Sequence, residues 1–266
     1  MSPFGLDFTA PAPRQAPLEV APGTFVVRAL TASVGGTWTN LNAMVIRAAE
    51  PVVVDTGMIT HRETWFDDVF SLVDPRDVRW IFVTHNDSDH SGNLVEALER
   101  CPNANVVTSH GESYRTWASF GIPFERMRMV DNGESFDAGD RTLLALRPPV
   151  YDSPYTRGLF DSTTRVYYAS DAFCAPNPAV PVDWVEEIPP PVWEESMARF
   201  HFASLCPWIA MVDQARFQAE IDKLVRLGID TIVGAHTPPV GKPSVGQAFA
   251  QLARLPSAVL QTGQHS

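Results

Sequence analysis

The stretch Val-Thr-His-Asn-Asp-Ser-Asp-His-Ser-Gly, residues 83–92, contains two histidines and two aspartates between His85 and His90. It follows the apolar run RWIFVTH (79–85) and leads into GNLVEALER (92–100), whose apolar residues recur at helical intervals. A single aspartate or histidine at this place would be explained as a cap of the following helix. Four such residues, in a loop that joins a buried strand to a helix, favour a metal site instead.

The rest of the chain predicts an α/β fold, because short apolar runs typical of buried strands alternate with segments of helical spacing. Acidic or imidazole side chains recur where strands end, at His85, Asp171 and His236. Loops at the carboxyl ends of strands commonly project into one crevice, so this is where we expect the chemistry. The predicted strands are 24–30, 42–48, 51–57, 79–85, 104–110, 141–147, 164–171 and 230–236, and the predicted helices are 61–73, 92–100 and 215–228.

The length and composition indicate an ordinary globular protein. The 266 residues, 45% apolar, suit an extended Pro- and Ala-rich arm over residues 1–22 and one domain over residues 23–266. The net charge of −11 argues against a nucleic-acid or acidic membrane partner, because polyanions would be repelled. Three widely spaced cysteines and the lack of a signal-peptide or membrane-span pattern lead us to expect reduced thiols and a cytoplasmic location.

The motif TH-x-D-x-DH-SG resembles the signature loop of the metallo-β-lactamase fold superfamily. Within it, the motif is most similar to the diiron domain of flavodiiron proteins and related oxygen-binding diiron proteins, because Asp87 stands where the hydrolases commonly carry histidine. The segment SDAF (170–173) resembles the one that carries the family's bridging aspartate, here Asp171, and His236 in VGAHTPP matches the last histidine of the fold. The resemblance implies an αββα sandwich, with two mixed sheets flanked by helices.

One position departs from the family pattern. The family places a further histidine 19 residues before the bridging aspartate, and Asp152 stands at that place here. A competing alignment puts Arg147 there, which could not bind the ion because guanidinium keeps its proton; an absent ligand is the other alternative. With Asp152, the resemblance implies two ion positions. The first comprises His85, Asp87, Asp152 and Asp171, and the second comprises Asp89, His90, Asp171 and His236.

Three imidazoles and four carboxylates without a thiolate suit iron or manganese at least as well as zinc, and we favour iron. The resemblance implies that the protein binds or reduces O2 or NO. The chain ends 30 residues after His236 and shows no phosphate-binding loop, so we expect it to bind no FMN and to receive electrons from a separate donor protein. A hydrolase that uses a metal-bound hydroxide on an ester-like substrate is the alternative. A non-catalytic module and a homodimer also remain open.

Other residues receive simpler interpretations. Arg147, Tyr155 and Arg157 are expected in the pocket. Asp55, in a DTG turn, is expected to be structural or to support the ligands from behind. His201, among aromatic residues, is expected to pack in the interior.

Overall fold

The computed structural model describes residues 12–33 and 36–262 and contains two β-sheets. The first sheet has seven strands in sequence order: β1 (Leu18–Ala21), β2 (Thr24–Ala32), β3 (Trp38–Ile46), β4 (Val52–Val54), β5 (Trp80–Phe82), β6 (Asn105–Thr108) and β7 (Met127–Met129). The second sheet has five strands in the order β12-β11-β10-β9-β8: β8 (Ser135–Asp137), β9 (Thr142–Leu146), β10 (Gly158–Asp161), β11 (Val166–Tyr168) and β12 (Thr231–Val233).

Both sheets are mixed. Strands β1 to β4 pair antiparallel and β4 to β7 pair parallel. In the second sheet β11 and β12 are parallel and the other pairs are antiparallel. The helices are α1 (Arg62–Leu72), α2 (Ser88–Ser91), α3 (Leu94–Arg100), α4 (His110–Phe120), α5 (Pro190–Phe200), α6 (Gln214–Val225) and α7 (Lys242–Thr262), with a π-helical turn at His201–Leu205. Short 3-10 helices lie at Ile59–His61, Phe124–Arg126, Val185–Glu187 and Pro207–Met211.

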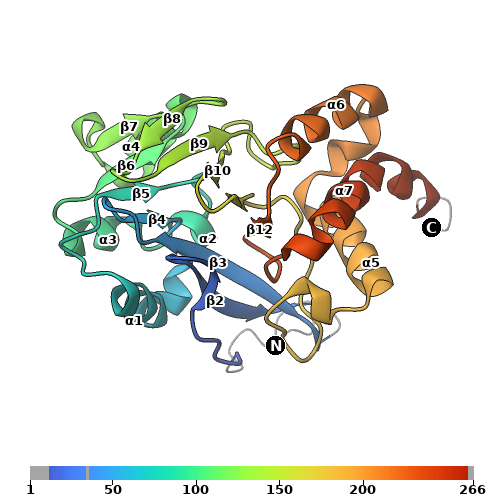
Figure 1. The fold of residues 1–266 in the computed structure, drawn as a ribbon, viewed down its shortest axis with the longest axis horizontal. Helices are drawn as coiled ribbons and strands as arrows, with labels where there is room; N and C mark the ends of the chain where they lie inside the picture. Colours follow the sequence, from blue (N-terminus) through green and yellow to red (C-terminus); the bar gives the residue numbers. More distant parts are fainter. Residues whose placement is uncertain (1–11, 34–35, 263–266) are drawn as a thin grey trace.

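The elements form four layers, as the resemblance implies. In β4, Val52 and Val54 lie in the core between the two sheets, whereas Val53 lies in the core under α1 and α3. This alternation follows from the two-residue period of a strand. On the other side, Tyr167 of β11 shares a core with Trp193 of α5 and with residues of α6 and α7. Helices α1 and α3 therefore lie on one outer side of the molecule and α5, α6 and α7 on the opposite side (Figure 1).

All eight predicted strands and all three predicted helices have counterparts, with different ends. The predicted strand 42–48 begins earlier, at Trp38, because β3 pairs with β2 along its whole length. Residues 18–21 of the expected arm form β1, which pairs with β2, so this part of the arm is held in the first sheet. Residues 1–11 of the arm lie outside the described residues. Within the described ranges, no helix combines the length and apolar character needed to cross a membrane.

The strand register brings distant polar residues to one end of the fold. Strands β11 and β12 run parallel with Tyr168 beside Val233. Asp171 and His236 each lie three residues beyond this pair, and His85 lies three residues beyond Phe82, the last residue of β5. The carboxyl ends of parallel strands open into a common crevice, so these three loops can meet there.

Candidate metal centre

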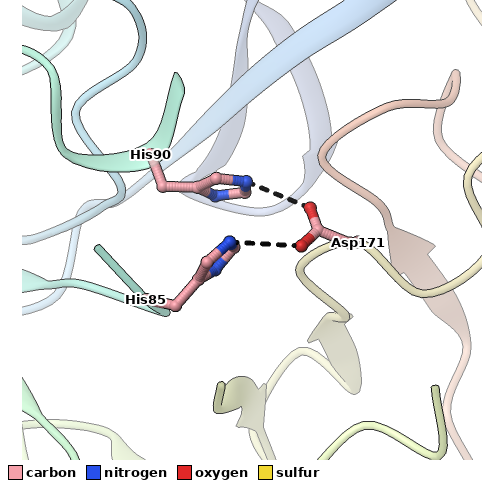
Figure 2. Close-up of side chains that lie close together, drawn as sticks. All are labelled: His85, His90 and Asp171. Carbon is pink, nitrogen blue, oxygen red and sulfur yellow. Dashed lines mark ion pairs between the residues drawn. The ribbon is translucent and has the colours of Figure 1, made fainter. Parts of the chain in front are cut away.

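Asp171 is the centre of the polar cluster, and its two carboxylate oxygens face different histidines. His85 Nε2 lies 3.3 Å from Asp171 Oδ2, whereas His90 Nε2 lies 3.0 Å and His236 Nε2 3.2 Å from Asp171 Oδ1. Figure 2 shows the rings of His85 and His90 directed at the two oxygens. Asp171 therefore presents one oxygen to each of two ligand groups, as a bridging carboxylate requires.

The two groups contain the residues that the sequence places at the two ion positions. In the first, His85 Nε2 lies 3.7 Å from both Asp87 Oδ2 and Asp152 Oδ1. In the second, Asp89 Oδ2 lies 3.6 Å from His90 Nε2 and 3.2 Å from His236 Nε2. Donor atoms that share an ion at bond lengths of about 2.1 Å are separated by roughly 3–3.5 Å. The distances to Asp171 and between Asp89 and His236 lie in this range, and the remaining ones, at 3.6–3.7 Å, are slightly longer, so both groups are close to the spacing of a metal site.

The donor atoms at the centre of the cluster have no other role in the fold. Both carboxylate oxygens of Asp171 and Nε2 of His85 are buried, and they have no hydrogen-bond partner among the described residues. Buried polar atoms are nearly always satisfied, so unpaired buried atoms that converge on one point are typical of a metal site. The oxygen- and nitrogen-rich donor set suits first-row metal ions. These residues therefore fit a pair of such ions.

The histidines of the second group are held by strong acceptors behind their rings. The Nδ1–H of His90 donates to Asp55 Oδ2 over 2.7 Å, and the Nδ1–H of His236 donates to the carbonyl oxygen of Asn40 over 2.8 Å. These bonds leave both Nε2 atoms free to bind an ion. Asp55 is held in turn by the backbone N–H and hydroxyl of Thr84, at 2.8 and 2.9 Å. The interpretation of Asp55 as a supporting residue is thus confirmed.

The backbone around the cluster adopts conformations that are costly elsewhere. Asp55, Ser170 and Phe173 have positive φ values of 59°, 52° and 67°. Such residues cost about 1–3 kcal/mol each and concentrate at functional sites. Gly92 permits close contact between the ligand loop and the DTG turn, because a Cβ atom there would lie 2.8 Å from the carbonyl oxygen of Gly57. The loop is therefore held by its packing on this turn.

Opposite charges stabilise the cluster when no cation balances it. Burial alone would raise the pKa of Asp171, but the surrounding imidazoles, above all that of His90, hold it well below its ordinary value. Burial would likewise lower the pKa of His236, yet Asp171 and Asp89 raise it to about 10. At Asp152, burial and the charge of Asp171 raise the pKa of the carboxyl. A bound cation would replace the histidine protons as the partner of these carboxylates.

A cavity of about 160 Å³ lies over the cluster. Its lining includes all seven residues that the sequence predicts as ligands: His85, Asp87, Asp89, His90, Asp152, Asp171 and His236. The other lining residues, Phe200, Ser204 and Leu205, come from the end of α5 and the π-helical turn, and no motif in the sequence marked them. Phe200 and Ser204 also line a larger cavity of about 400 Å³ between α5 and residues 176–178.

The three residues expected in the pocket lie elsewhere. The side chain of Arg147 is exposed, and Tyr155 is 42% exposed against Gly111 of α4. Arg157 is buried and forms an ion pair with Asp131. None of the three is among the residues that line the cavity over the cluster. The ion pair of Arg157 with Asp131 and the packing of Tyr155 on Gly111 account for two of these positions.

Two further residues have structural explanations. His201 is buried, and its Nδ1–H donates to the carbonyl oxygen of Met197, which confirms it as a packing histidine. The thiol of Cys174 lies within 4.8 Å of donor atoms of Asp171 and His236 but donates to the backbone oxygen of Asp171. Burial raises the pKa of this thiol well above its ordinary value.

The sandwich and its carboxylate–histidine cluster define a protein of the metallo-β-lactamase fold class. The family model described as "ODP family beta lactamase" matches residues 39–237, so the chain belongs to this family.

Named relatives match part of the chain. A putative diflavin flavoprotein A 3 of Nostoc sp. is 29% identical over 136 residues, covering 51% of this chain and 24% of that protein. A type A flavoprotein of Rhodobacter capsulatus is 29% identical over 168 residues, covering 59% of this chain and 39% of that protein. The alignments therefore span well under half the length of these relatives.

Solved structures share the fold over most of the chain. The rubredoxin oxygen:oxidoreductase of Desulfovibrio gigas has a TM-score of 0.77 at 19% identity, covering 90% of this chain and 61% of that one. The fragment 1–254 of a putative diflavin flavoprotein A 5 of Nostoc sp. also has a TM-score of 0.77 at 19% identity, covering 94% of this chain and 98% of that one. At this identity the likeness establishes the fold alone.

Proposed function

We propose that the protein is a dinuclear iron protein that binds or reduces O2 or NO, with electrons supplied by a separate donor. The observation that carries the proposal is Asp171, whose two oxygens face two separate groups of metal-type ligands. The three imidazoles and four carboxylates of the cluster suit iron. The names of the relatives support this direction, since they are flavoproteins and an oxygen:oxidoreductase.

Two iron ions held by these residues would supply electrons and coordination positions for a diatomic ligand. The chain's own contribution is to hold and shield that centre. Asp171 joins the two groups, and Asp55 and the carbonyl of Asn40 fix the ring orientations of His90 and His236. Phe200 and Leu205 add apolar surface to the lining of the cavity over the cluster.

The size of the cavity favours a small ligand over a hydrolase substrate. At about 160 Å³ it is smaller than the roughly 300–1,000 Å³ typical of sites for larger organic ligands. The additional carboxylates, Asp87 and Asp152, would also make an ion in the first group a poorer Lewis acid. Both features weigh against the alternative that the protein is a hydrolase.

The test is expression of the full chain with iron, followed by metal analysis and measurement of NO and O2 uptake by the reduced protein. We expect two irons per chain and uptake that depends on them, with loss of both in Asp171→Ala. Asp67→Ala, at an exposed position on α1, serves as the control and should behave as the parent. Zinc as the retained metal, together with turnover of an ester panel, would overturn the proposal.

A further inference from the structure

The two ligand groups differ in their donor atoms. The first group has one imidazole, from His85, and three carboxylates, from Asp87, Asp152 and Asp171. The second group has two imidazoles and two carboxylates, from Asp89 and Asp171. Imidazole nitrogen suits iron, zinc and copper ions, whereas carboxylate oxygen suits harder ions such as Mn²⁺. The donor sets alone therefore predict different metal preferences.

The groups also differ in how far they are removed from solvent. The side chains of Asp87 and Asp152 in the first group are 48% and 32% exposed. In the second group Asp89 is 20%, His236 11% and His90 2% exposed. Water can therefore compete with the protein for an ion in the first group more readily than in the second.

A third difference lies in the contacts that hold the ligands in place. His90 and His236 each donate to a carboxylate or carbonyl oxygen at 2.7–2.8 Å. His85 has only hydroxyl oxygens behind its Nδ1, that of Thr84 at 3.2 Å and that of Ser170 at 3.4 Å. A hydroxyl is a weaker acceptor than a carboxylate, so it orients the ring less firmly and does less to raise its basicity.

The carboxylates of the first group are held by no hydrogen bond and are the more exposed. No hydrogen bond from any described residue reaches the side-chain oxygens of Asp87 or Asp152, and the Asp87 side chain makes no capping bond to the helix that follows it. Asp89 of the second group also lacks such a bond, but its side chain is only 20% exposed. Asp87 and Asp152, at 48% and 32% exposed, therefore lose more side-chain freedom when they bind an ion, which lowers the affinity of the position they form.

We propose that the two metal positions are unequal. The position formed by Asp89, His90 and His236 holds its ion tightly, whereas the position formed by His85, Asp87 and Asp152 binds weakly, exchanges its ion and accepts a harder ion such as Mn²⁺. This inference rests on the proposed dinuclear centre. Supporting contacts of the kind present only in the second group typically change metal affinity by about 10–100-fold, so we expect at least a tenfold difference between the positions.

The test is a titration of the chelator-treated full chain with Mn²⁺, in which electron paramagnetic resonance measures the unbound ion. We expect two classes of site whose dissociation constants differ at least tenfold. After loading with Zn²⁺ and gel filtration, we expect metal analysis to find one retained ion per chain. The retained zinc, held in the tight position, should leave the weak class open to Mn²⁺.

Three variants assign the classes to positions. Asp152→Ala should abolish the weak class and leave the tight class unchanged. Asp152→His, which adds an imidazole to the first group, should raise zinc retention toward two ions per chain. Asp67→Ala is the matched control and should change neither class.

The outcomes separate this inference from the proposed function. Two ions of equal affinity in the parent chain, or loss of the tightly held ion in Asp152→Ala, would overturn the inequality while leaving a dinuclear centre intact. Binding of no ion by the parent chain would overturn both.

Discussion

Raising the pH from about 7 to about 8.5 should destabilise the chelator-treated protein, because His236 keeps its proton in the fold. The pKa of this imidazole lies at about 10 in the folded chain, against an ordinary value of 6.5. In this window the unfolded chain has released the proton and the folded chain still holds it. Stability therefore falls as the pH rises, and this contribution is lost completely only above pH 10.

The magnitude follows from the pKa difference. Each pH unit in the window costs about 1.4 kcal/mol per retained proton, so His236 alone accounts for a loss of about 2 kcal/mol over roughly 1.5 units. The pKa of His90 is also raised, by Asp171 and Asp55 against the effect of its burial, and acts in the same direction. A loss of at least about 2 kcal/mol is expected.

Three other shifted groups have most of their effect outside this window. The contribution of Asp171, whose pKa is lowered, is complete above the ordinary range of a carboxyl and is lost only in acid. Burial lowers the pKa of His201 to about 4, so its effect lies below pH 6.5. Burial raises the pKa of Glu112 to about 7, so its effect is largely finished where the window begins.

The assay is urea unfolding of the chelator-treated chain, followed by circular dichroism at several pH values. His236→Gln should remove the part of the slope that corresponds to one proton. A free energy of unfolding that stays constant or rises across the window in the parent chain would refute the reasoning, because it would mean that His236 is not an imidazolium partner of Asp171 and Asp89.

Three further outcomes are expected. Asp171→Ala should lose both ions in metal analysis, and retention of two would contradict its bridging position. Asp55→Asn should weaken the ion at His90 by about 10–100-fold in competition with a chromogenic chelator; an unchanged affinity would show that the ring needs no carboxylate behind it. Gly92→Ala should lower the free energy of unfolding by about 1–3 kcal/mol in urea, because its Cβ would approach the carbonyl oxygen of Gly57; an unchanged midpoint would contradict that contact.

The sequence by itself determined the alternation of buried strands with helices, and it marked the loop from His85 to His90 as a candidate metal-binding segment. Runs such as PVVVDTG and RWIFVTH are apolar at consecutive positions, and a strand covered on both faces requires that pattern. The loop from His85 to His90 could be recognised because its ligands lie within one short segment. Strands β1, β7, β8 and β10 escaped prediction because they are short and have no distinctive pattern of their own.

Only the tertiary structure decided how the candidate ligands are arranged and supported. The register of β11 and β12 sets Asp171 beside His236, and the turn after β9 brings Asp152 within 3.7 Å of His85. The same packing places Asp55 behind His90 and excludes Arg147 from the cavity. These contacts join residues that lie far apart in the chain. They cannot be predicted from short sequence segments, because strand pairing and sheet packing, rather than sequence spacing, fix the distances between such residues.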